Sequence, residues 1–434
     1  MLKSRLCIAF FAFAVGCAPA QKPLTDYVNP MLGTATLWDS VDLGFKPTKR
    51  TWGAEVFPGS SLPNAMVQVS PVTKFHSGAG YQYEDSVIYG FTHTNKGHWN
   101  LCHIPLLPVT GTPTPGDYCS PFSHERESAA PGYYQVFLDR YGVDAQLSST
   151  LRCAFHKYTY PAGAAASLLA DLQRSNEHVR AWDIRKEGDN VFAGWQQTGE
   201  KMYFYAVANR PVTGIEPVVE GDREVRIVRF GEGDGALELR IGFSFVSEKN
   251  ARENLEAEML GKSFAEVRSE ATATWNDLLG RIRVEGGTER EKGLFYSSLY
   301  RSFLWPALRS DVNGEFTDVD GKVINPGFRY YTGPSYWDDY RNKLILLGML
   351  APDVAADVIS SDTDKGEKRG GFMPTFFHGD HASAFVAGTY LRGNRGFDVN
   401  RAYNLVLRYR ARAARGSTSI LPRGTFRKWT SRIP

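Results

Sequence analysis

One short run of side chains that could do chemistry lies in residues 335–341, SYWDDYR. This run places an aromatic platform, two carboxylates and a guanidinium within about two helical turns. Trp337 offers the platform, and Asp338 and Arg341 are three residues apart, so they share one face of a helix. They could form an ion pair or together hold the vicinal hydroxyls of a sugar. A helix-starting Asp followed by a surface Arg has the same spacing, and the spacing leaves both interpretations open.

A second polar cluster, residues 376–381 (FFHGDH), precedes an apolar segment. Its candidate binding residues are His378, Asp380 and His381. An Asp directly before a helix can accept hydrogen bonds from the first free backbone N–H groups. Asp380 is therefore expected to cap the following helix, to contact a sugar, or to do both.

Residues 77–111 form a loop-like run rich in aromatic and imidazole groups, of the kind that can line a polar cleft. Its candidate substrate contacts are His93 and Trp99. The histidines at 93, 98 and 103 are five residues apart, without a helix or a cysteine pair to organise a metal site. Hydrogen-bonded structural histidines and substrate-binding histidines remain the two main alternatives, and zinc is the least favoured.

Asp311, Asp318 and Asp320 lie in a Gly-containing loop and offer oxygen atoms that would suit calcium. The loop lacks the ligand order of an EF-hand and its terminal bidentate Glu. A plain pair of turns is the favoured interpretation.

The elements that must position these groups predict a multidomain β + α fold. Residues 23–247 contain short strand-like segments bounded by Gly, Pro, Asn or Asp, which favours an antiparallel β-sandwich. Residues 248–285 show helical periodicity and are expected to form a helical connector. Residues 286–434 are expected to hold a partial α/α catalytic domain. Its predicted helices cover residues 289–309, 337–350, 354–364, 381–392 and 400–412, whereas a closed (α/α)6 barrel needs about twelve helices. The helical domain is therefore expected to be incomplete.

The composition is that of a folded protein, and 434 residues are more than one ordinary core accommodates. Aromatic residues reach 13%, which suits either a sugar-binding cleft or the core of a β-rich domain. The net charge is only +3, and the first 390 residues contain no basic patch with interleaved aromatic residues. Nucleic acid is not an expected partner.

Residues 1–20 resemble an export signal: Lys3 and Arg5 precede a ten-residue apolar run that is too short to span a bilayer. Cleavage after Ala20 competes with a lipobox-like site that ends in Cys17, so a lipid anchor on Cys17 is an alternative. No transmembrane helix is expected, and the protein is predicted to be periplasmic or an outer-membrane lipoprotein. Cys102, Cys119 and Cys153 would allow one disulfide.

The last segment, residues 399–434, is atypical because it contains many arginines and no Asp or Glu. A helix without acidic partners differs from the balanced sequence before it. A basic surface tail and a truncated or frame-shifted reading frame are the two interpretations.

Several blocks occur in the order found in glycoside hydrolase family 92, and together they resemble that family to about residue 400. The blocks are DYVNP at 26–30, GT at 33–34, FPG at 57–59, MVQVSP at 66–71, GYQYED at 80–85, IYGFTHT at 88–94, VEGGTE at 284–289, FY at 295–296, LYR at 299–301 and WDDYR at 337–341.

The resemblance implies a β-sandwich packed on an (α/α)6 barrel, an active site between them, and a calcium ion as cofactor. Family members are inverting exo-α-mannosidases, in which an acid and a base stand roughly 6.5–9.5 Å apart around a water. Calcium bound to the sugar would help flatten its ring in the transition state. Trp337, Asp338 and Arg341 match the family's WDxxR motif, which implies that they hold the terminal mannose.

Two departures from the family pattern bear on catalysis. Residues 370–381 contain no Glu where the family keeps its general acid, and the acidic block that carries the base does not occur in this chain. No catalytic residue is therefore assigned, and the chain is expected to be an incomplete form of an enzyme for α-mannose in N-glycans or mannan. The alternatives are a non-catalytic carbohydrate-binding protein, a mannosyl-phosphodiester hydrolase and a structural envelope protein.

Overall fold

The computed structural model describes residues 22–36, 44, 54, 56–96, 99–233, 235–371 and 380–416. The predicted leader with its Cys17 anchor, His98, His378 and the tail beyond residue 416 lie outside the described residues. Trp99 is described by its backbone alone.

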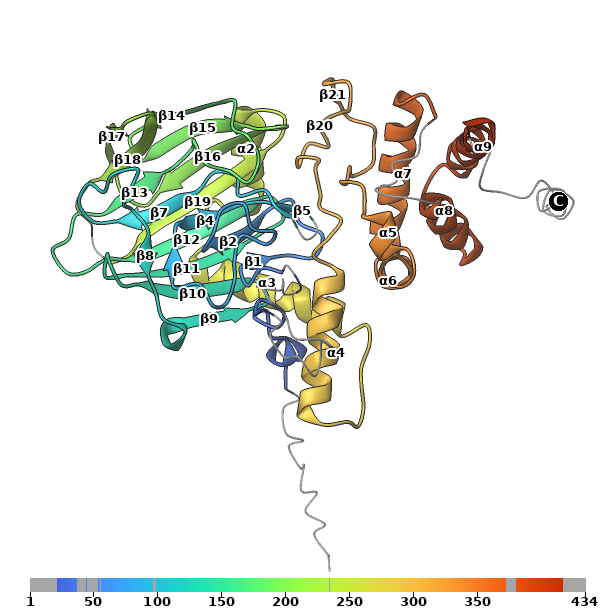
Figure 1. Ribbon diagram of the computed structural model, residues 1–434, viewed down its shortest axis with the longest axis horizontal. Helices are drawn as coiled ribbons and strands as arrows, with labels where there is room; N and C mark the ends of the chain where they lie inside the picture. Colours follow the sequence, from blue (N-terminus) through green and yellow to red (C-terminus); the bar gives the residue numbers. More distant parts are fainter. Residues whose placement is uncertain are drawn as a thin grey trace, which may run out of the picture.

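Two antiparallel sheets form the amino-terminal domain (Figure 1). The first contains β1 (Ser60–Ser61), β2 (Gln68–Val72), β4 (Gly90–Thr92), β7 (Leu106–Val109), β13 (Ser167–Ala170), β18 (Arg223–Phe230) and β17 (Val212–Glu220), in this spatial order. The second contains β14 (Ala181–Gly188), β15 (Val191–Gln197), β16 (Lys201–Ala208), β19 (Leu237–Ser244), β12 (Cys153–Thr159), β11 (Val143–Ser149), β10 (Tyr133–Leu138) and β9 (Glu127–Ala130). The predicted antiparallel β domain is confirmed.

Short elements decorate these sheets. They are η1 (Leu24–Tyr27), the pair β3 (Val87–Ile88) and β8 (Ser120–Pro121), the pair β5 (Asn95–Lys96) and β6 (Trp99–Asn100), η2 (His124–Arg126), and the pair β20 (Phe316–Thr317) and β21 (Val323–Ile324).

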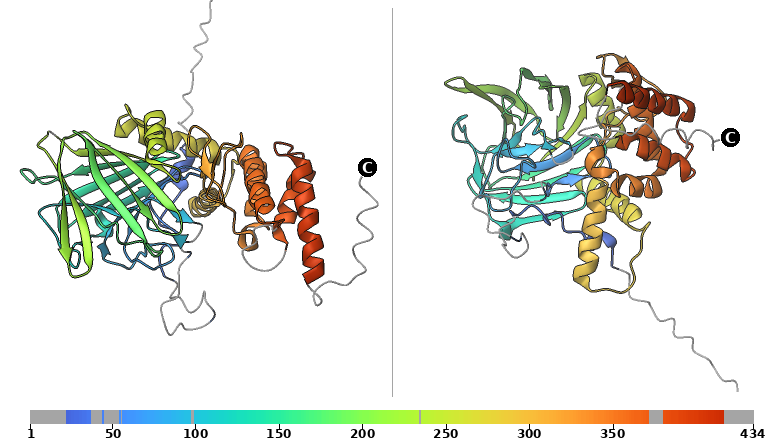
Figure 2. Two further views of the ribbon diagram at one scale, coloured as in Figure 1. Left: turned by 90° about the horizontal axis from the view of Figure 1, so that it is seen from above. Right: turned by 45° about the vertical axis from the view of Figure 1, so that its right-hand side comes forward.

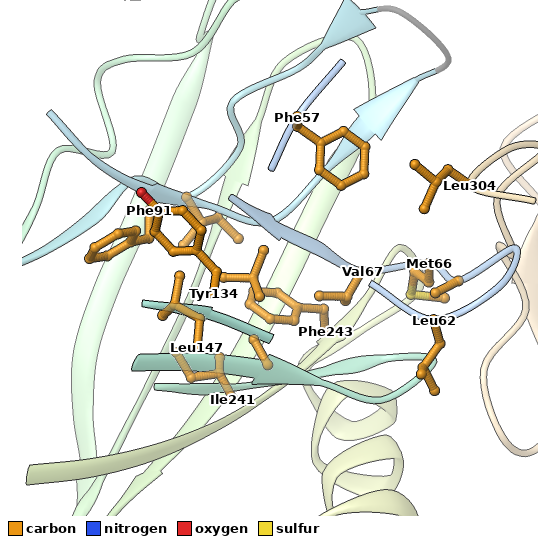
Figure 3. Packing of buried hydrophobic residues seen from close by; sticks show 14 of the residues in the cluster. Phe57, Leu62, Met66, Val67, Phe91, Tyr134, Leu147, Ile241, Phe243 and Leu304 are labelled. Atoms are coloured by element: carbon orange, nitrogen blue, oxygen red, sulfur yellow. The ribbon is translucent and has the colours of Figure 1, made fainter. Parts of the chain in front are cut away.

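The core lies between the two sheets, because their strands alternate buried and half-buried residues. β16 shows this alternation along its whole length, as expected for a strand with one face on a core. Figure 3 shows Phe91 of the first sheet facing Tyr134, Leu147 and Phe243 of the second, all with no exposed surface. Burying each such large apolar side chain contributes about 1.5–3 kcal/mol, so the sandwich is a rigid base for the loops at its ends.

The connector consists of two helices, α2 (Glu248–Glu258) and α3 (Phe264–Leu279). Ser263 and Glu266 form a capping box at the start of α3, which pairs the first free N–H groups. Gly261 lies in the turn between the helices with φ +96°, a conformation that glycine adopts without strain. Leu255 and Phe264 pack with Phe155 on the outer face of the second sheet, which fixes the connector to the sandwich.

The next helix, α4 (Glu289–Ser302), ends well before the predicted limit at residue 309. That extension was wrong because Pro306 lacks an N–H and keeps the residue before it out of the helical conformation. The following segment is extended instead, and Leu308 bridges to Tyr331. This change places Arg309 beside the sandwich rather than on a helix.

The remaining helices are α5 (Tyr336–Asp339), α6 (Lys343–Leu350), α7 (Pro352–Lys368), α8 (His381–Leu391) and α9 (Val399–Gly416). Figures 1 and 2 show them gathered on one side of the sandwich. The single helix predicted over residues 337–350 was wrong, because Asn342 leaves the helical conformation and its side chain caps α6. The β domain followed by a helical domain is confirmed, and no helix in the described ranges has the length and apolar character needed to cross a bilayer.

Buried polar contacts hold the two domains together. Arg152 of the sandwich donates from Nε to the Ser310 carbonyl (2.8 Å) and forms an ion pair with Glu258 of α2 (2.6 Å). Asp311 accepts hydrogen bonds from Ser244 (2.7 Å) and from Asn254 (2.7 Å).

The loop after α4 forms turns, as predicted: backbone bonds join Gly314 to Asp311 and Gly321 to Asp318. Cys102, Cys119 and Cys153 are free thiols. The disulfide that these cysteines would allow is therefore not present.

Candidate functional site

An exposed aromatic cluster lies where α5 meets the start of α8. Trp337 is 47% exposed, and its ring lies 5.8 Å from that of His381, nearly edge-on. His381 also stacks on Tyr340, with ring centroids 4.0 Å apart and an interplanar angle of 16°. We call Trp337, Asp338, Tyr340, Arg341, Asp380 and His381 the Trp337 cluster.

The two charged groups of the WDxxR motif are both exposed. Asp338 accepts a hydrogen bond from the Ser335 hydroxyl (2.5 Å), and the Arg341 Nε donates to the Tyr340 hydroxyl (2.9 Å). Within the described residues no ion pair joins Asp338 to Arg341, so the structure does not show the contact that their spacing allowed. Each keeps hydrogen-bonding capacity toward solvent, since a carboxylate accepts at two oxygens and a guanidinium donates five N–H groups.

Asp380 caps α8, as its position predicted, by accepting from the Ser383 backbone N–H (3.2 Å). Its other oxygen forms an ion pair with Arg410 of α9 (2.9 Å). The neighbouring His381 has a buried Nε2 with no hydrogen-bond partner in the part of the chain that the structure describes.

A buried ion pair is hydrogen-bonded to Tyr336, the residue before Trp337. Tyr336, next to Trp337, donates its hydroxyl to Asp362 of α7. Asp362 also pairs with Lys365 (3.1 Å), which donates to the Tyr331 carbonyl (2.7 Å). Burial raises the pKa of Asp362 and lowers the pKa of Lys365, because low polarity penalises each charged form.

His93 lies inside the sandwich and has no exposed surface. Its Nε2 is 3.0 Å from Nε2 of His156, and its ring lies 4.5 Å from that of Phe243. Burial lowers the pKa of His93 to about 3, so the ring is neutral. Of the alternatives that the sequence left open, the structure places His93 in the hydrogen-bonded core and does not bring it to the Trp337 cluster.

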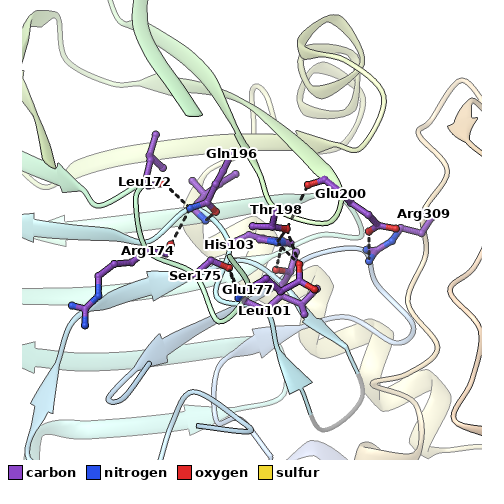
Figure 4. A network of polar contacts seen from close by, with 12 residues as sticks. Leu101, His103, Leu172, Arg174, Ser175, Glu177, Gln196, Thr198, Glu200 and Arg309 are labelled. Carbon is purple, nitrogen blue, oxygen red and sulfur yellow. Dashed lines mark hydrogen bonds and ion pairs between the residues drawn. The ribbon is translucent and has the colours of Figure 1, made fainter. Parts of the chain in front are cut away.

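Sequence reasoning missed a second polar group, at the seam where the segment that carries Arg309 meets the sandwich (Figure 4). Arg309 reaches Glu200, in the turn between β15 and β16, with Nη2 3.3 Å from Oε2. Glu177 lies nearby and accepts from the Thr198 hydroxyl (2.6 Å). Arg309 was hidden in the over-long helix prediction, and no local pattern marked the two glutamates.

The family resemblance implies a calcium ion, and the described ranges can be compared with that expectation through their clusters of metal-binding side chains. There, no three side chains of His, Cys, Asp or Glu gather closely enough to hold a metal ion.

Two family models match the chain. One, described as the glycosyl hydrolase family 92 N-terminal domain, matches residues 27–253, and the other, described as the family's catalytic domain, matches residues 250–431.

Solved structures show the same arrangement. The family GH92 α-mannosidase BT3965 from Bacteroides thetaiotaomicron is 26% identical with a TM-score of 0.81, over 90% of this chain and 56% of that one. The GH92 glycosyl hydrolase ccman5 is 26% identical with a TM-score of 0.75, over 89% of this chain and 56% of that one.

A curated relative, an uncharacterized secreted glycosidase from Arthroderma benhamiae, is 24% identical over 344 residues, which are 67% of this chain and 42% of that protein. The chain thus spans about half the length of the proteins that it matches. With a family model covering more than half of its residues, and the shared fold of the solved structures, this chain belongs to glycosyl hydrolase family 92.

Proposed function

We propose that the Trp337 cluster binds a terminal α-linked mannose and that the chain is part of an α-mannosidase of this family. One observation carries the proposal: α5 and the start of α8 bring an exposed Trp337, the ring of His381 and the exposed charges of Asp338 and Arg341 together. A structure of BT3965 contains mannoimidazole, which supports a mannose-like ligand for this fold.

The chemistry of the cluster suits a sugar. The face of a hexose carries C–H groups that pack on an aromatic ring, and its hydroxyls both donate and accept hydrogen bonds. Asp338 would accept from hydroxyls, whereas Arg341 would donate to them. In the proposal these two residues grip vicinal hydroxyls while Trp337 and His381 hold the ring.

The test is calorimetric titration of the chain with methyl α-mannoside. Asp338→Ala should weaken binding about tenfold or more, because it removes a charge-assisted hydrogen bond. The matched control is Asp277→Ala, an exposed carboxylate that is paired with Arg281 at 2.8 Å, and it should leave affinity unchanged. Equal affinities for wild type and Asp338→Ala would remove this residue from the site.

Turnover separates the proposal from its rivals. Two other carboxylates at the cluster are already engaged, Asp339 with Lys343 and Asp380 with Arg410, which favours binding without hydrolysis as the second candidate. Release of mannose from an α-mannoside would support the enzyme, release from a mannosyl phosphodiester alone would support the phosphodiesterase, and binding without release would support the binding protein.

Calcium and export belong to the same proposal. A gain in mannose affinity with added calcium, lost with EDTA, would support a calcium ion that takes part in sugar binding. We also propose that residues 1–20 direct export to the periplasm or, through Cys17, to the outer membrane, in keeping with the secreted relative. Membrane fractionation of wild type and Cys17→Ser distinguishes the two destinations.

A further inference from the structure

Two buried histidines join the sheets of the sandwich. His93 follows β4 of the first sheet, and His156 lies in β12 of the second. Their Nε2 atoms are 3.0 Å apart, and neither residue has any exposed surface. Because a hydrogen bond needs one donor and one acceptor, one of these two nitrogens carries a proton and the other does not. The two rings therefore share a single proton across the space between the sheets.

The neighbours of the pair decide where its protons lie. Nδ1 of His156 is 2.6 Å from the Tyr158 hydroxyl, and this is the hydroxyl's one hydrogen bond within the described ranges. Nδ1 of His93 accepts from no donor among the described residues, and the backbone of His103 and Ile104 beside it favours a proton on this ring. We therefore assign one direction to the chain of bonds. Tyr158 donates to His156, and the Nε2–H of His156 donates to Nε2 of His93.

This chain of hydrogen bonds has no place for a further proton. A proton added to Nε2 of His93 would face the N–H of His156. A proton added to Nδ1 of His156 would turn the Tyr158 hydroxyl away from its partner, and an unpaired buried hydroxyl is costly. Every group is satisfied only while both rings are neutral.

Apolar rings surround the pair. The ring of Phe243 lies 4.5 Å from that of His93, and the ring of Phe91 lies 6.4 Å from that of His156. Figure 3 shows both phenyl rings in the core. Burial lowers the pKa of His93 to about 3 and holds the pKa of His156 well below its usual value of 6.5, because low polarity penalises the charged form.

No carboxylate faces the pair in the part of the chain that the structure describes. The titratable groups beside it are Tyr158 and His103, and a charge on His103 would oppose a charge on His93. His103 itself differs from the pair, since its Nε2 lies 3.7 Å from a carboxylate oxygen of Glu177. A proton on His103 therefore finds a counter-ion, whereas a proton on the pair finds none.

We propose that His93 and His156 form an acid-sensitive latch between the two sheets. The latch is closed while both rings are neutral, and uptake of a proton opens it and loosens the sandwich. The inference does not depend on which ligand the Trp337 cluster binds.

The direction of the pH effect follows from proton binding. Below a pH of about 6.5, histidines of the unfolded chain take up protons that the closed latch cannot accept. The contribution of the latch to stability is therefore complete above that pH and falls as the pH drops.

The test measures the folding equilibrium constant of the full chain by urea unfolding at about pH 7.5 and about pH 5. The variants are His93→Gln and His156→Gln, because glutamine can accept and donate hydrogen bonds but does not titrate. Each histidine of the latch should reduce the constant about 30-fold between these two pH values. Each variant should therefore lose about 30-fold less than wild type. The control is His178→Gln, an exposed histidine of the same domain, which should lose as much as wild type.

Nitrogen NMR of wild type with isotope-labelled histidine rings is a second measurement that needs no variant to fold. At about pH 5 both rings of the latch should remain neutral, with the proton on Nδ1 of His93 and on Nε2 of His156. Imidazolium signals from either ring in the folded protein would overturn the latch. A folded variant that loses as much stability in acid as wild type would overturn it as well.

Discussion

Replacing Asp362 with Asn should destabilise the helical domain severely. The side chain of Asp362 is 1% exposed and that of its partner Lys365 is 11% exposed, at an N–O distance of 3.1 Å. The substitution keeps the volume and a hydrogen-bond acceptor for Tyr336, but it leaves the ammonium of Lys365 buried without a counter-ion. The Tyr331 carbonyl then remains as a hydrogen-bond acceptor for this ammonium.

The expected loss is about 3–5 kcal/mol of unfolding free energy, because removing one partner of a buried pair leaves an uncompensated charge. The double variant Asp362→Asn, Lys365→Met should recover most of this loss, since it removes the stranded charge as well. The matched control on the same helix is Glu367→Gln. That pair with Arg401 is 35% and 48% exposed, and its loss should cost no more than about 1 kcal/mol.

Urea unfolding followed by far-ultraviolet circular dichroism measures all three variants, and the helical signal reports on α7 and its neighbours. A loss below about 1 kcal/mol for Asp362→Asn, or a double variant no more stable than the single one, would refute the claim that a buried charge pair supports the Trp337 cluster.

Three further predictions concern the sandwich and its contacts. Glu258→Ala should lower the free energy of unfolding in urea by about 3–5 kcal/mol, because it leaves the buried Arg152 without its carboxylate partner. Glu256→Ala, in the exposed ion pair of α2, should lower it by only about 0–1 kcal/mol. Equal losses of unfolding free energy for the two variants would contradict this prediction. The nearby His103, whose Nε2 lies 3.7 Å from the carboxylate, lowers the pKa of Glu177 from 4.5 to about 2. Glu177 therefore stabilises the fold above pH 4.5 and loses that contribution as the pH falls toward 2, so acid titration of Glu177→Gln should show a shallower decline than wild type. Gly132→Ala should lower the melting temperature, because φ is +78° and the added Cβ would lie 2.5 Å from that of Ala271; an unchanged melting temperature would show that α3 moves aside.

The broad organisation was readable from local sequence. Strand segments such as β10, β16 and β18 fall on stretches with period-two or apolar patterns, and the capping Asp380 precedes its helix as expected. These features depend on residues a few positions apart, which is the range over which backbone preference and capping act. The family could also be identified from the sequence, because the blocks and their order are read along the chain without knowing which distant segments meet.

The breaks within helices were harder to predict. The apolar periodicity of residues 337–350 continues through the break before Asn342, so a pattern based on spacing joins α5 to α6. In α4 the periodicity was extended past the point where Pro306 prevents a helix. In both cases a local capping or steric effect overrode the apolar pattern.

The sequence by itself determined the family, the order of a sandwich followed by helices, and the choice of the WDxxR motif as a candidate binding site. Only the tertiary structure decided whether an individual polar group is exposed, buried or paired. Asp338 is exposed whereas its neighbour Asp339 is buried against Lys343, and His93 lies in the core. Arg309 meets Glu200 across 109 positions of sequence. The physical reason is that burial and charge pairing depend on which distant segments the folded chain brings together, and no local spacing contains that information.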